Sequence, residues 1–64
     1  IDTRSTYYAN ALYWRGTARY RQQLWADALA LLDRYLADYP QGDHRLSARD
    51  YRNICAARLS TQGG

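Results

Sequence analysis

The segment from Leu24 to Tyr39 constrains the fold most, because its apolar residues follow one face of an α-helix. They recur at intervals of three and four residues, while aspartate, arginine and alanine fill the opposite face. Pro40 and Gly42 follow directly, and a proline cannot continue a helix. We therefore predict an amphipathic helix over 24–39, with one buried stripe made of Trp25, Ala28, Leu29, Leu32, Tyr35, Leu36 and Tyr39.

Two further helices are expected, over residues 5–22 and 46–60, and no segment alternates as a strand would. Only Gln22 and Gln23 join the first two, so these should pack as an antiparallel hairpin. The sequence predicts an all-α domain over 1–64, with three antiparallel helices and a disordered tail over 61–64. The inward side of the third helix should comprise Ala48, Tyr51, Ile54, Cys55, Arg58 and Leu59, and its outward side Arg49, Arg52 and Asn53.

The first helix carries more aromatic residues than one buried stripe can hold. One apolar row comprises Tyr7, Ala11, Trp14 and Ala18. Tyr8, Leu12 and Gly16 form the adjacent row, and a third row of Tyr13, Thr17 and Tyr20 is displaced around the helix. Some of these aromatic side chains must therefore face a second neighbour, a partner or water.

Gly16 lies in the middle of this helix, where a glycine costs about 1 kcal/mol relative to alanine. In an antiparallel hairpin with a turn near Gln22, Gly16 and Ala28 lie at similar heights. Two small residues at one level let the two helices approach closely. We therefore expect Gly16 to serve a close crossing of the first and second helices.

The positions of Gly16, Ala28, Leu32 and Pro40 resemble the pattern of the tetratricopeptide repeat, a helical hairpin of about 34 residues. Leu12 takes the usual tryptophan position of that pattern. Arg15 and Arg19 depart from its usual leucine and tyrosine, and Gln23 replaces a frequent turn glycine. The strings "NALYWRG" and "DYPQGDHRLSARDYRN" are also similar to repeats of bacterial Tol-Pal and outer-membrane assembly proteins. The matching residues are Asn10, Ala11, Tyr13, Trp14, Gly16, Tyr39, Pro40, Ala48 and Tyr51.

This resemblance implies a fragment of a right-handed α-solenoid, with one repeat hairpin followed by a capping or half-repeat helix. It implies binding of a peptide or helix of another protein on the concave face of the first helix, in a bacterial envelope assembly and so in the periplasm. The residues that correspond to this face are Asn10, Tyr13, Thr17, Tyr20 and Arg21. Because arrays usually need about three repeats, we expect this chain to be a piece of a longer protein or to self-associate.

Other functions and folds stay open at this point. An unrelated three-helix bundle could also contain these small residues and this proline. The net charge is +3, and Arg45, Arg49 and Arg52 share one side of the third helix, so nucleic-acid binding is an alternative to protein binding or to a purely structural, self-associating role.

The residue types argue against catalysis and against a bound cofactor. The aspartates are scattered over outward faces, and no nucleophile stands with a base in a recognisable pattern. The single cysteine, Cys55, is expected in the core, and the single histidine, His44, in a solvated loop. We therefore expect a protein that is no enzyme, with no metal and no membrane span.

Overall fold

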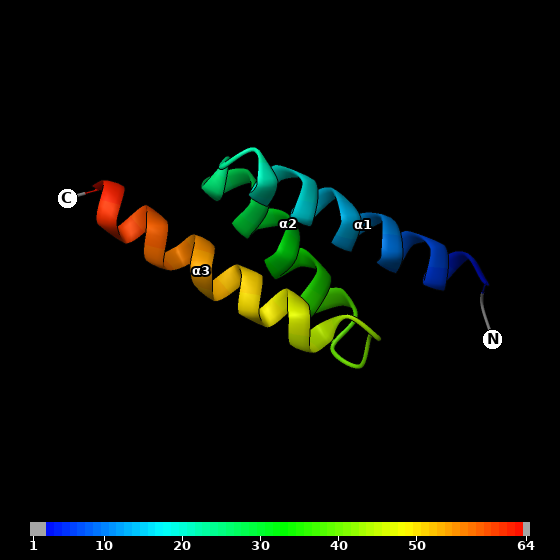
Figure 1. Cartoon of the computed structure of the whole chain (residues 1–64). Coiled ribbons are helices and arrows are strands. Elements are labelled where there is room, and N and C mark those ends of the chain that lie inside the picture. Colours follow the sequence, from blue (N-terminus) through cyan, green and yellow to red (C-terminus); the bar gives the residue numbers. More distant parts are fainter. Residues whose placement is uncertain (1–2, 64) are drawn as a thin grey trace.

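Three helices account for the part of the chain that the structure describes. The computed structural model describes residues 3–63, and side chains over residues 7–61. Helix α1 covers Thr3–Arg21, α2 covers Trp25–Asp38 and α3 covers Arg45–Gly63. Each helix runs antiparallel to the one before it, and α2 lies between the other two (Figure 1). The prediction of an all-α chain with three antiparallel helices is confirmed.

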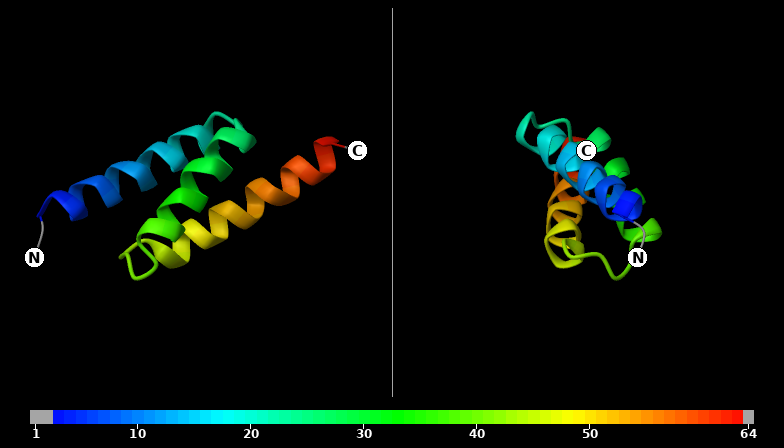
Figure 2. Two further views of the ribbon diagram at one scale, coloured as in Figure 1. Left: turned by 180° about the vertical axis from the view of Figure 1, so that it is seen from behind. Right: turned by 90° about the vertical axis from the view of Figure 1, so that its right-hand side faces the viewer.

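The outer helices extend beyond the middle one. Helices α1 and α3 each have 19 residues, and α2 has 14. The first turns of α1 and the last turns of α3 project past α2 at opposite ends of the molecule (Figure 2). Contacts between α1 and α3 are few compared with those that either makes to α2. Large parts of the two outer helices therefore meet no other helix of this chain.

The turn between α1 and α2 has the hydrogen bonds of a Schellman motif. Gln23 N–H donates to Tyr20 O at 2.9 Å, and Leu24 N–H donates to Arg19 O at 3.0 Å. Gln23 adopts a left-handed conformation with φ of 63°, in which glycine would be unstrained. The short antiparallel connection predicted from Gln22 and Gln23 is thus realised, with a non-glycine residue at its strained position.

The close crossing at Gly16 is confirmed. A methyl group at Gly16 would lie 2.9 Å from Cδ2 of Leu32, which is fully buried. Ala28 is also fully buried on the same face of α2. The absence of a side chain at Gly16 therefore lets Leu32 pack directly on the backbone of α1.

The loop after α2 is tied to the core by Tyr35. Its side chain is fully buried, and its hydroxyl accepts a hydrogen bond from the His44 N–H at 3.0 Å. A Cβ atom at Gly42 would collide with the Tyr35 hydroxyl oxygen. Gly42 is consequently needed for space beside Tyr35, whereas α2 already ends at Asp38 with Tyr39 as its C-cap.

Helix α3 differs from the prediction at its end and on one side. It continues through Gly63, so the tail predicted as disordered is helical over 61–63, and Gly64 lies outside the described residues. The Thr61 hydroxyl donates to Ala57 O at 3.0 Å, and no proline interrupts this turn. Ala48 and Cys55 are fully buried as predicted, but Ile54 is 38% exposed, because α1 reaches so little of α3.

Candidate interaction surface

The five residues expected on a concave face do not form one open surface. Arg21 is exposed, and Asn10 and Tyr20 are half-buried. Tyr13 is only 6% exposed and Thr17 only 4% exposed. Tyr13 and Thr17 are therefore covered within this chain, and of the expected set Asn10, Tyr20 and Arg21 reach solvent.

Tyr13 is buried because the loop before α3 covers it. The ring of His44 stacks on the Tyr13 ring, with centroids 4.2 Å apart and planes 6° from parallel. Tyr35 and Tyr51 approach the same ring, at centroid distances of 5.9 and 6.5 Å. The prediction that His44 is simply a solvated loop residue is wrong, because its ring forms part of this packing.

The next two positions of the same row are enclosed in similar ways. The Thr17 hydroxyl donates to Trp14 O at 2.9 Å, so its polar atom is satisfied within α1. The Tyr20 ring packs against Tyr51 of α3 at 4.8 Å and against Trp25 of α2 at 5.5 Å. The row thus forms an aromatic cluster where all three helices meet.

The opposite side of α1 carries the open apolar surface. We call the row of Tyr7, Ala11, Trp14 and Ala18 the outer row. Tyr7 is 69% exposed and Trp14 is 55% exposed, and neighbouring Tyr8 is 57% exposed. The prediction that some aromatic side chains of this helix stay outside the core is confirmed, although the sequence did not show which row this would be.

Helical geometry explains why the outer row faces away from the core. The buried positions of α1 are Ala9, Tyr13, Gly16 and Thr17. At about 3.6 residues per turn, residues 7, 11, 14 and 18 fall on the other side of the helix. Helix α1 therefore has two apolar faces, and this chain buries one of them. On the other face the Trp14 ring makes edge contacts with Tyr13 and His44, at centroid distances of 5.1 and 5.7 Å, and keeps more than half of its surface exposed.

Arginines border the outer row on both sides. Arg15 and Arg19 lie on one flank and Arg21 on the other, and all three are exposed. Residues Thr3–Arg21 include no aspartate or glutamate. Over the residues described, the ion pairs are Arg34 with Asp38 and Arg52 with Asp33, so no arginine of the outer row's flanks takes part in one.

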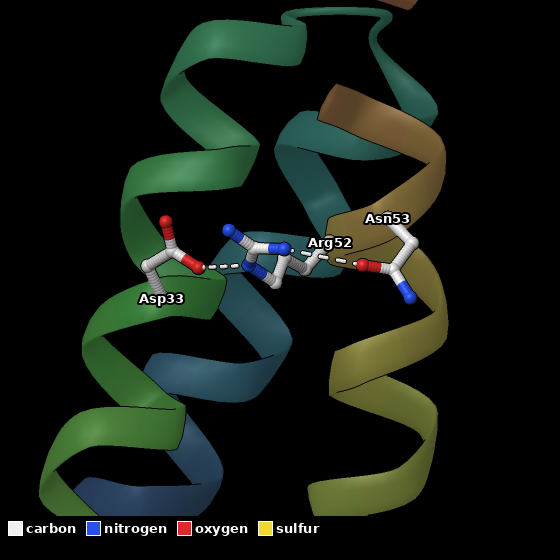
Figure 3. Close-up of polar contacts among 3 residues, drawn as sticks. All are labelled: Asp33, Arg52 and Asn53. Carbon is white, nitrogen blue, oxygen red and sulfur yellow. Dashed lines mark hydrogen bonds and ion pairs between the residues drawn. The ribbon is translucent and has the colours of Figure 1, made fainter. Parts of the chain in front are cut away.

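The basic side predicted on α3 is partly used within the molecule. Arg52 donates through Nε to Asp33 on α2 and through Nη1 to Asn53 Oδ1 at 3.1 Å (Figure 3). Arg45 donates to the Gly42 carbonyl at 3.1 Å. The prediction that Arg52 points away from the other helices is therefore wrong. Of the three arginines in this stripe, Arg45 and Arg52 already make hydrogen bonds within the chain, so fewer guanidinium groups are available to a nucleic acid than the sequence suggests.

Across residues 3–63, no three side chains of His, Cys, Asp and Glu are grouped to hold a metal ion. Burial raises the pKa of the Cys55 thiol, and the ion pair with Asp38 raises the pKa of Arg34. None of the three helices, as described, is long and apolar enough to cross a membrane.

Comparisons with protein-family models, with curated proteins and with solved structures gave no match.

Proposed function

We propose that this chain is a helical protein-binding module whose contact surface is the outer row of α1. The observation that carries the proposal is the exposure of two large aromatic side chains of the outer row, Tyr7 at 69% and Trp14 at 55%. Large aromatic side chains at helical spacing are costly to leave in water and are common anchors of protein interfaces.

The proposed surface differs from the concave face that the family resemblance implies. Tyr13 and Thr17 of that face are covered by the chain itself. Asn10 and Arg21 lie beside the outer row, so the proposed contact surface includes them. Tyr20, half-buried between α2 and α3, acts in this proposal as a packing residue that holds α1 in place.

The resemblance to tetratricopeptide repeats supports a protein-binding role of this kind. The contact between Gly16 and Leu32 falls at two positions that carry the resemblance. We accordingly propose that residues 9–40 form a repeat-like hairpin, that α3 follows it as a half-repeat or cap, and that the module belongs to an assembly of the bacterial envelope.

Self-association is the second candidate, because the same exposed rings could meet in two copies of this chain. Leu46 of α3 is also 64% exposed, so each end helix presents apolar atoms. Sedimentation equilibrium over a range of concentrations separates the two: a monomer that binds another protein supports the first proposal, and a concentration-dependent oligomer without a further partner supports the second.

A capture experiment followed by titration tests the proposed function. The baits are the natural chain, an outer-row variant with Tyr7→Ser and Trp14→Ser, and a control with Leu46→Ser and Ile54→Ser on exposed positions of α3. Far-UV circular dichroism checks that all three have equal helicity. A protein captured from a lysate of the source organism is purified and titrated by calorimetry.

The outer-row variant should bind the captured protein at least about tenfold more weakly, the loss expected for removing interface anchors. The α3 control should bind like the natural chain. Equal binding of all three baits would show that the outer row is not the contact surface.

A further inference from the structure

The outer row has the alternation of large and small side chains that is typical of a surface packed against another helix, and we call this surface the seam. Its side chains alternate in size, from Tyr7 to Ala11 to Trp14 to Ala18, at spacings of four, three and four residues. The alanines leave hollows between the rings, and side chains of a facing helix fit into hollows of this kind. Ala11 of the row lines an open groove of about 510 Å³ against α2, together with neighbouring Tyr8 and Leu12. The charged residues in the lining of this groove are Arg15, Arg34 and Asp38.

The charged residues of α1 that border this seam are all basic, and the one carboxylate of the adjoining groove, Asp38, already pairs with Arg34. Arg15 and Arg19 border it on one flank and Arg21 on the other, and α1 carries no acidic residue. A neutral or basic helix seated here would bring no charge that pairs with these guanidinium groups. An occupant with carboxylates at the corresponding flanks would find partners on both sides.

Within this chain, α2 and α3 already pack through an apolar surface that is bordered by oppositely charged side chains. Ala48 and Cys55 of α3 pack in the buried seam, and beside them Arg52 pairs with Asp33 of α2. Figure 3 shows the guanidinium group reaching across between these two helices. An apolar seam bordered by an arginine–aspartate pair is thus how α2 and α3 join.

From the seam, its charge and this internal example, we infer that the outer row binds an amphipathic helix of another protein, with an apolar stripe bordered by aspartate or glutamate. This inference rests on the proposed function and adds the chemistry of the partner. Arg15, Arg19 and Arg21 select the acidic flanks, and Tyr7 and Trp14 anchor the apolar stripe.

A second copy of this chain fits the surface less well. Helix α3 carries four arginines and one aspartate, so placing it on α1 brings like charges together. Helix α2 carries three aspartates, but Asp33 and Asp38 already pair with Arg52 and Arg34 within the chain. Of the three, only Asp27 has no ion pair within the described residues, so a helix of a different sequence can offer carboxylates on both flanks where this chain offers one.

Selection from a displayed library of designed helices tests this inference. Each helix has about 18 residues, or five turns, with a fixed apolar stripe of leucine and alanine and randomised flanking positions. The natural chain serves as the target, and the variant with Tyr7→Ser and Trp14→Ser removes helices that bind elsewhere. The helices retained by the natural chain alone should carry an excess of Asp and Glu on both flanks.

The strongest binder is then titrated against two charge variants. Changing Arg15, Arg19 and Arg21 together to glutamine should weaken binding about tenfold, since exposed ion pairs contribute little each and three are lost. Changing Arg45, Arg49 and Arg58 of α3 to glutamine alters the net charge equally and should leave binding within about twofold. Added salt should reduce the difference between the two variants.

Several results would overturn the inference. These are selection of neutral or basic flanks, failure to enrich any helix, and equal loss in both charge variants. Binding to vesicles of phosphatidylcholine and phosphatidylserine through the outer row, with no helix enriched, would identify a membrane face instead. A captured cellular partner that meets the outer row without an acidic helix would leave the proposed function standing and overturn only this inference.

Discussion

Replacing Gly16 by alanine sets two opposing effects of known size against each other. In a helix interior that nothing touches, the change should stabilise the fold by about 1 kcal/mol, because alanine is the better helix former. In this structure the added methyl group would lie 2.9 Å from Cδ2 and 3.0 Å from Cγ of the fully buried Leu32. Overpacking of this kind costs about 1–3 kcal/mol.

The cost should exceed the gain, so we expect Gly16→Ala to lower the free energy of unfolding by about 1 kcal/mol. Leu32→Ala alone should lower it by about 2–5 kcal/mol, since it leaves a cavity. In the double variant the methyl group at position 16 enters that cavity. The combined loss should fall short of the sum by about 1 kcal/mol or more.

Urea unfolding followed by far-UV circular dichroism measures all three variants. Ala18→Gly, at an exposed position of the same helix, serves as the control for helix propensity and should cost about 1 kcal/mol. A Gly16→Ala variant more stable than the natural chain by about 1 kcal/mol, or additive losses in the double variant, would refute the argument that Gly16 serves the crossing with Leu32.

Three further predictions concern the loops and the core. Gln23→Gly should raise the free energy of unfolding by about 0.5–1 kcal/mol in the same urea assay, because residue 23 has φ of 63°, and a loss would contradict that conformation. Gly42→Ala should be destabilising because Tyr35 Oη occupies the space, and adding Tyr35→Phe should restore part of the loss; no restoration would show that this contact is not the cause. Cys55 should react with a thiol reagent only as fast as the fold opens, because its side chain is fully buried and its pKa is raised. Since the folded state favours the neutral thiol, the free energy of unfolding should be unaffected by this group below the ordinary thiol pKa of about 8.5 and should fall as the pH rises above it. Rapid labelling under native conditions would refute the last prediction.

The sequence predicts most of the fold because its signals are local. The apolar stripe of α2 and the stop at Pro40 define that helix within one residue at each end. Gly16 indicates a close crossing because a mid-helix glycine with no turn residues beside it usually lets another element approach closely. Cys55, expected in the core from its place on the inward side of α3, is fully buried.

The site was harder to predict because α1 has two apolar faces of similar character. Choosing between Tyr13 and Trp14 as the buried aromatic residue depends on the direction from which α3 and its loop approach. In the structure the His44 ring stacks on Tyr13 and so covers Tyr13 rather than Trp14. These two residues are far apart in the sequence, so local patterns could not predict the contact. The end of α3 was also mispredicted, because a terminal glycine weakens a helix without stopping it.

Site-specific photo-cross-linking tests the central claim, that α1 binds another protein through its outer row. A benzoylphenylalanine residue replaces either Ala18 in the outer row or Ala37 on α2, both of which are exposed, in the organism that makes the protein. We predict an adduct with one other protein from position 18, absent from position 37 and lost when Tyr7→Ser and Trp14→Ser are added. Equal adducts from both positions, or adducts only between copies of this chain, would contradict the claim.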